Sequence, residues 1–159
     1  MNSGSGPEGG APHGITLFDH AEISAAIAEG DRGTAEVLAP RRLTEAQWNA
    51  STAHWMARMG DEVRDKGKEA RIAHLYSEAF GKAQDALKPV PVMDAAGYAT
   101  LVVDIQRAGS PSEPLARRAL SNADYLRLSR HWAKVLSSDP EQAALFFEAY
   151  QALHAGSAA

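Results

Sequence analysis

The sequence contains no cysteine among its 159 residues. That absence excludes disulfide bonds, thiolate nucleophiles, iron–sulfur clusters and cysteine-ligated zinc sites. Long hydrophobic runs are also missing, since no stretch approaches the roughly 18 apolar residues of a membrane-spanning helix. The N-terminus lacks the charged start and the apolar segment of a signal peptide. We therefore expect a soluble, cytoplasmic protein with no membrane partner.

The chain has no excess of basic residues. It holds 16 lysines and arginines against 20 aspartates and glutamates, which gives a net charge of −4. A general nucleic-acid binder needs a basic excess or a segregated basic face, so the charge disfavours nucleic acid as a partner. Alanine, by contrast, is abundant, with 31 residues. Because alanine has the highest intrinsic helix propensity, this composition favours closely packed helices.

The hydrophobic pattern of the first half predicts four helices. Apolar residues recur every three or four positions, as they do on one face of an α-helix. Thr44 and Gln47 have the spacing of a capping box at the start of the third helix. The predicted helices are long, short, long and long, and they cover residues 16–30, 34–39, 44–63 and 69–87.

The second half repeats this order. Most matching residues lie 77 positions apart, and the matches of the last helices lie 70 apart. The smaller offset indicates a deletion before the final helix, which Asp139 and Pro140 begin as N-cap and first helical residue. The matching pairs include Leu43-Thr44 with Leu120-Ser121, His54-Trp55 with His131-Trp132, and, at an offset of 76, Arg41-Arg42 with Arg117-Arg118. Matches in the same order along the chain predict an internal duplication.

These patterns predict an all-α fold. We expect two tandem repeats of four helices, long, short, long and long, packed as one pseudo-symmetric domain. The repeats cover residues 15–88 and 90–155. Residues 1–14 are rich in glycine, proline and serine and cannot bury enough apolar surface to offset their ordering entropy, so we expect a disordered tail.

No catalytic pattern is present in the sequence. We find no Ser-His-Asp arrangement, no nucleophile elbow in the helical region and no glycine-rich phosphate loop. His54 and His131 both precede a tryptophan, where a histidine at the edge of the core is favoured over a metal ligand. We therefore predict no catalytic, cofactor-binding or metal-binding residue and no enzyme. A small enzyme or a metal-binding helical protein is the second alternative.

The repeated arginine pairs have two interpretations. Each pair follows a short helix, where a guanidinium can bond the last carbonyls and interact favourably with the helix dipole. Alternatively, Arg117 and Arg118 could recognise phosphate or carboxylate groups. A short helix before a capped long one also suggests a helix-turn-helix DNA-binding protein, which is the first alternative function. Acidic residues later in the first long capped helix, such as Asp61, Glu62 and Asp65, argue against it.

The two repeats differ on one helix face. Arg127, Arg130 and Lys134 form a basic stripe at helical spacing in the second repeat. The first repeat has alanines at the same positions, namely Ala50, Ala53 and Ala57. We expect the alanine face to be packed and the basic face to be open, either as an ordinary solvated surface or as a surface for an acidic partner.

Phe147 departs from the aromatic core pattern of the last helix. Phe146 and Tyr150 share one face, which turns Phe147 about 100° away, to a position where the first repeat has Ser77. The ring either fills the interface between the repeats, which we favour, or is an exposed anchor for a partner.

The second repeat resembles an α-helical repeat of uncharacterised bacterial proteins that has no assigned activity. The residues that carry the resemblance are Leu115 to Ser121, Tyr125, His131-Trp132, Asp139-Pro140 and Phe146 to Tyr150. The first repeat departs from this pattern because it lacks the Asp-Pro turn. The resemblance implies an adaptor-like role associated with bacterial secretion or contractile-injection systems.

Taken together, the sequence predicts a non-catalytic protein–protein interaction or adaptor module without a cofactor. The expected partner is another protein. The more specific hypothesis is that this partner has an acidic surface. The candidate partner-binding residues are Arg117, Arg118, Arg127, Arg130, Lys134 and Phe147.

Overall fold

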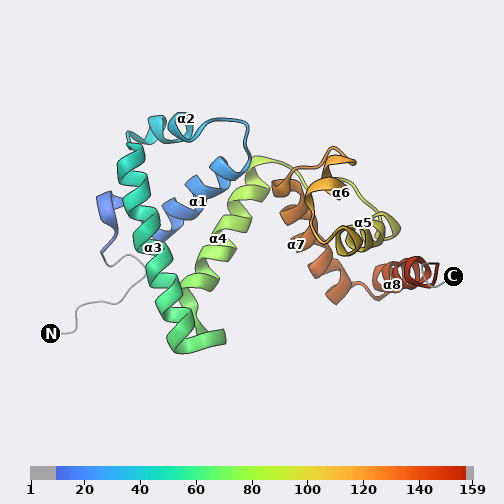
Figure 1. Ribbon diagram of the computed structural model, residues 1–159. Coiled ribbons are helices and arrows are strands. Elements are labelled where there is room, and N and C mark those ends of the chain that lie inside the picture. The colour runs from blue at the N-terminus through green and yellow to red at the C-terminus, as the bar shows by residue number, and fades with distance from the viewer. Residues whose placement is uncertain (1–9, 157–159) are drawn as a thin grey trace. The chain divides into compact units, whose positions relative to one another are not determined.

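The computed structural model describes residues 10–156, and within them every regular element is helical. The all-α prediction is therefore confirmed. The chain divides into two compact units, Met1–Lys88 and Pro89–Ala159, which we call unit 1 and unit 2 (Figure 1). Within the described range, no helix combines the length and the apolar character needed to cross a membrane.

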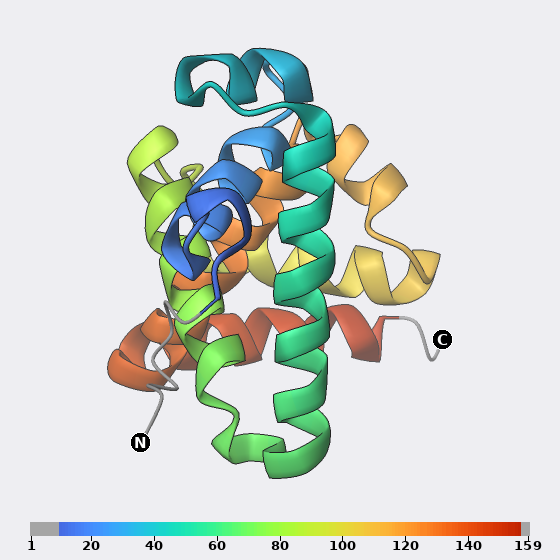
Figure 2. The same ribbon diagram turned by 90° about the vertical axis from the view of Figure 1, so that its left-hand side faces the viewer.

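Within the described range, unit 1 has four α-helices and three short turns of 3-10 helix. Their bounds are η1 Pro12–Gly14, α1 Leu17–Ala28, α2 Thr34–Leu38, η2 Ala39–Arg41, α3 Glu45–Lys66, η3 Gly67–Glu69 and α4 Arg71–Leu87. Capping boxes begin the first and third helices: the Thr16 hydroxyl accepts from the Asp19 amide, and that of Thr44 accepts from the Gln47 amide. The chain reverses at η3, so α3 and α4 run antiparallel (Figure 2).

The core of unit 1 lies where α1 contacts α3 and α4. Helix α1 packs chiefly against α4, and α3 supplies two buried tryptophans. One cluster forms around Trp48 with Ile23 and Leu38, and a second around Trp55 with Leu17. Each tryptophan buries a large apolar area, so these two residues dominate the packing of α3.

The predicted disordered tail is wrong for its last residues. Residues 1–9 lie outside the described range, but Pro12–Gly14 forms η1 and Ala11 packs against the Trp55 cluster. The physical cause is a long-range contact, because the indole N–H of Trp55 donates to the carbonyl of Ile15 at 3.1 Å. Composition alone cannot reveal a bond between residues so far apart in the sequence.

Unit 2 repeats the order of long and short helices. Its helices are α5 Ala95–Ala108, α6 Ser112–Ala116, α7 Asn122–Ser138 and α8 Pro140–Ala155. Helix α5 packs chiefly against α8, around a core that includes Tyr98 and Trp132. The predicted start of the last helix is confirmed, since the Asp139 carboxylate accepts from two amides of the first turn and Pro140 is the first helical residue.

Candidate functional site

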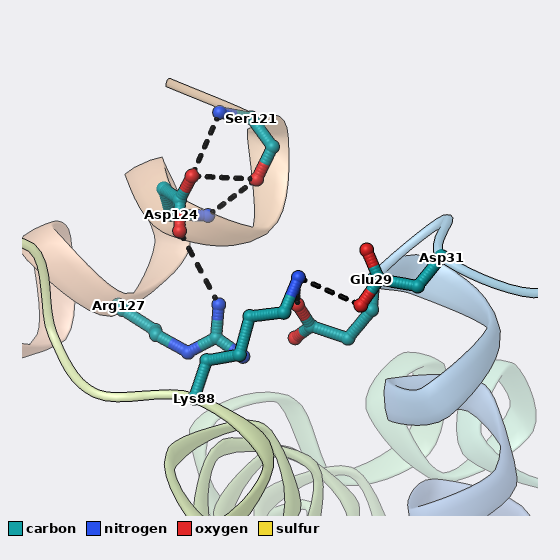
Figure 3. A network of polar contacts seen from close by, with 6 residues as sticks. All are labelled: Glu29, Asp31, Lys88, Ser121, Asp124 and Arg127. Carbon is teal, nitrogen blue, oxygen red and sulfur yellow. Dashed lines mark hydrogen bonds and ion pairs between the residues drawn. The ribbon is translucent and has the colours of Figure 1, made fainter. Parts of the chain in front are cut away.

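The predicted open basic stripe on α7 is wrong at its first residue. Arg127 is completely buried and Arg130 half-buried, whereas Lys134 is exposed. The Asp124 carboxylate lies 3.5 Å from the Arg127 guanidinium and also accepts from the Ser121 amide and hydroxyl at the helix N-terminus (Figure 3). A buried charge needs such a partner, and the long arginine stem can pack as an apolar group.

The alanine face of α3, which we expected to be packed, also differs from the prediction. Ala50, Ala53 and Ala57 are all exposed. Helix α3 buries the face that carries Trp48 and Trp55, and the alanines lie on the other side. Since alanine is tolerated on exposed and packed helix surfaces alike, the alanine spacing did not identify the buried face.

The second arginine of the unit 2 pair has a structural role. Arg118 donates to the carbonyl of Pro114 at 3.0 Å and to the Asp104 carboxylate at 2.6 Å, which links the end of α6 to α5. Its neighbour Arg117 is exposed and lies 4.0 Å from Glu113. Carbonyl bonding by Arg118 matches the structural interpretation of the arginine pair.

The turns that carry the two arginine pairs have similar backbone geometry. Arg42 and Ala119 both adopt the left-handed conformation, with φ of 55° and 53°, and lie 77 residues apart. The amide that follows each of them closes the same turn, Leu43 onto Leu38 and Leu120 onto Leu115. The turn after the short helix of each unit therefore has the same backbone conformation, with Arg41 and Arg118 each preceding the left-handed residue.

Phe147 on α8 is 53% exposed and meets the Phe146 ring edge-to-face at 5.3 Å. Both interpretations of Phe147, at an interface between the repeats or as an anchor for a partner, therefore stay predictions. Phe147 lies on α8, whereas the candidate cations lie on α7 and just after α6.

A groove that the sequence did not single out runs along unit 1 between α1 and α4. Its volume is about 610 Å³, and the α2–η2 segment closes one side. We call it the α1–α4 groove, and it is lined by Phe18, Glu22, Ala26, Arg32, Val37, Pro40, Arg41, Ala79, Lys82, Ala83, Ala86 and Leu87. Most of these side chains are apolar, and Phe18 and Leu87 remain 44% and 45% exposed.

The charged side chains of the groove are mostly cationic. Arg41 donates to Glu22 at 2.8 Å, and Lys82 donates to Glu78, just outside the groove, at 2.8 Å. The bond from Lys82 lowers the pKa of the Glu78 carboxyl. Arg32, by contrast, makes no ion pair with any residue of the described range. Three cations and one carboxylate therefore face the groove.

An ion-pair cluster lies beside one end of the groove. The Lys88 ammonium is 2.7 Å from Asp31 and 3.5 Å from Glu29 (Figure 3). The hydrogen bond with Asp31 raises the pKa of Lys88. A small hollow there shares Ala26, Arg32 and Leu87 with the groove. The cluster thus links the C-terminal ends of α1 and α4, the two helices that form the groove walls.

His20 is a buried polar residue that sequence reasoning missed. It lies 3.1 Å from the Thr52 hydroxyl and stacks on the Trp48 ring at 4.5 Å. Burial lowers its pKa to about 4, so the ring is neutral at physiological pH. Its spacing from Ile23 and Ile27, on the apolar face of α1, was the available signal.

The described residues contain no group of three or more histidine, aspartate or glutamate side chains placed to hold a metal ion. No family model, curated protein or solved structure matches this chain. An open apolar groove with cations at its edges is suited to non-covalent binding of an elongated apolar ligand.

Sequence reasoning missed the groove although it predicted, over residues 69–87, the helix that forms one wall. Ala79, Ala83 and Leu87 lie on one apolar face of α4 and line the groove. The pattern shows that these residues are apolar, but it cannot show that part of the face lacks a covering helix.

Proposed function

We propose that this chain is a cytoplasmic, non-catalytic interaction module that binds another protein in the α1–α4 groove. The observation that carries the proposal is the groove itself, an open hollow of about 610 Å³ with a mainly apolar lining. Exposed contiguous apolar surface is costly in water, and it marks sites where a partner binds. The resemblance of the second half to bacterial helical repeats supports an adaptor role in a secretion or contractile-injection system.

The contacts of the arginines favour this function over DNA binding. A helix-turn-helix protein contacts phosphates with exposed cations. Here Arg127 is buried, and Arg118 is engaged with Asp104. Within the described residues, these two side chains are therefore poorly placed to neutralise phosphates.

We also propose that units 1 and 2 are pseudo-symmetric repeats that arose by duplication. The buried positions of α1 and α5 support this, because each pair lies 78 residues apart. They are Leu17, His20, Ala21, Ile23 and Ala25 in α1, and Ala95, Tyr98, Ala99, Leu101 and Val103 in α5. The polar partners correspond as well: His20 bonds Thr52, and Tyr98 bonds Ser129, 77 residues further on.

The test of the proposed function is capture of partner proteins from an extract of the source organism with a groove-filling variant. Ala86 lines the groove and is exposed, so Ala86→Trp fills the groove without entering the core. Ala57→Trp, on the exposed face of α3, is the matched control. We expect a partner that binds the wild type and Ala57→Trp but not Ala86→Trp. A partner retained by Ala86→Trp, or nucleic acid as the bound species, would overturn the proposal.

A further inference from the structure

We propose that the occupant of the α1–α4 groove is an amphipathic α-helix of another protein whose polar flank is acidic. This inference rests on the proposed function and specifies the chemistry of the partner. It follows from three features of the groove: its walls, its charges and the corresponding positions in unit 2.

The groove walls suit a helix. Ala79, Ala83 and Ala86 lie at helical spacing on α4, and Ala26 faces the groove from α1. Small side chains let another helix approach within the usual interaxial distance of about 8–10 Å. Phe18 and Leu87 supply exposed apolar surface to that helix. This arrangement is typical of recognition in which an amphipathic helix inserts its apolar face into a groove.

The charges indicate an acidic flank. Arg32, Arg41 and Lys82 face the groove, and Glu22 is the carboxylate among the lining residues. Arg32 has no ion-pair partner in the described range, so a carboxylate could bind it without displacing another group. Arg41 and Lys82 each bind a carboxylate already, so Arg32 is the lining cation that would most strongly repel a basic helix. Complementary charge therefore selects an acidic helix over a basic one.

At two of the positions that line the groove in unit 1, unit 2 carries a larger or a charged residue. By the offsets of the two units, Ala26 corresponds to Asp104 and Ala83 to Leu153. Asp104 binds Arg118 at 2.6 Å, whereas in unit 1 Arg41 binds Glu22, one helical turn before Ala26. The ion pair of unit 1 thus leaves Ala26 uncovered, as part of the α1 wall of the groove.

The experiment measures binding of synthetic helical peptides to the full chain by fluorescence anisotropy. One peptide of about 18 residues has leucines on one face and glutamates on the flanks, and a second has lysines in place of the glutamates. We expect the glutamate peptide to bind about tenfold or more tightly than the lysine peptide, with an advantage that shrinks in high salt. Equal affinities, tighter binding of the lysine peptide, or no binding of the glutamate peptide would overturn the inference.

Two variants locate the binding site. Arg32→Ser should weaken binding of the glutamate peptide about threefold or more, and Ala86→Trp should abolish it, while Ala57→Trp should leave it unchanged. Binding that survives Ala86→Trp also overturns the inference. The inference and the proposed function can fail separately. If the glutamate peptide does not bind the wild type, the inference fails. The proposed function still stands in that case, provided that Ala86→Trp no longer binds the partner captured from the extract.

Discussion

The imidazole of His20 lies 3.1 Å from the hydroxyl of Thr52, in the core where α1 meets α3. The ring is 1% exposed, and Trp48 and Tyr76 cover it from α3 and α4. The Ser24 hydroxyl lies 3.5 Å from the other ring nitrogen, and a histidine enclosed by aromatic rings with two uncharged hydroxyl partners is stable as the neutral form. This contact therefore makes the stability of unit 1 depend on pH.

We predict that unit 1 loses stability as the pH falls from about 6.5 to about 4. The pKa of His20 is lowered to about 4 in the folded state. Because the unfolded chain keeps a pKa near 6.5, it binds more protons in this window, and the contribution of the neutral ring, about 3 kcal/mol, is lost by pH 4. Urea unfolding at several pH values measures the loss.

The control for this prediction separates His20 from the carboxylates that also titrate at low pH. His20→Gln should flatten the dependence between pH 6.5 and 5, whereas His131→Gln, at an exposed position on α7, should keep it. A wild-type slope in His20→Gln would show that other groups cause the pH dependence.

Trp55 and Trp132, one in the core of each unit, should differ in their tolerance of phenylalanine. The Trp55 indole donates to the Ile15 carbonyl, whereas the buried indole N–H of Trp132 has no hydrogen-bond partner within the described range. Trp55→Phe leaves a buried carbonyl without its donor, and Trp132→Phe removes an unsatisfied donor. We expect Trp55→Phe to lower the free energy of unfolding by about 1–2 kcal/mol more than Trp132→Phe, as measured by circular dichroism in urea. Equal losses would contradict the assigned hydrogen bond.

The proposed duplication predicts that equivalent segments can be exchanged in one register only. Replacing residues 38–47 by residues 115–124 keeps the left-handed position and the capping residues in place, because Ala119 then occupies position 42 and Ser121 position 44. We expect this chimera to fold with a loss of about 2 kcal/mol or less, measured by thermal unfolding. The control inserts residues 114–123, which shifts every side chain by one position and should prevent cooperative folding. Similar stability of both chimeras would contradict the equivalence.

Removing the carboxylate from the groove should strengthen binding of the acidic peptide. Glu22→Gln releases Arg41 from its ion pair and removes a repelling charge, so we expect a twofold to fivefold lower Kd, or about 0.5–1 kcal/mol. The ion pair is partly exposed, so the free energy of unfolding should change by less than about 1 kcal/mol. Glu148→Gln, at an exposed position on α8, is the control and should not alter the Kd. Weaker binding by Glu22→Gln would contradict the assigned groove charges.

Local sequence signals predicted the helices well, because caps act over three or four residues. Thr44 with Gln47, and Asp139 with Pro140, begin helices where expected. The buried face of each helix depends on distant partners, and there the sequence misled. Arg127 is buried beside Asp124, while Ala53 is exposed. The groove was missed for the same reason, since an apolar helix face looks alike in sequence whether or not another helix covers it.

The central claim is that unit 1 binds an acidic amphipathic helix between α1 and α4. The most direct measurement is the map of backbone amide chemical-shift changes when the glutamate peptide is added to the isotope-labelled chain. We expect the largest changes at groove residues such as Ala26, Arg32 and Ala83, with small changes on the exposed face of α3. Changes concentrated on unit 2 or on the exposed face of α3 would contradict the account.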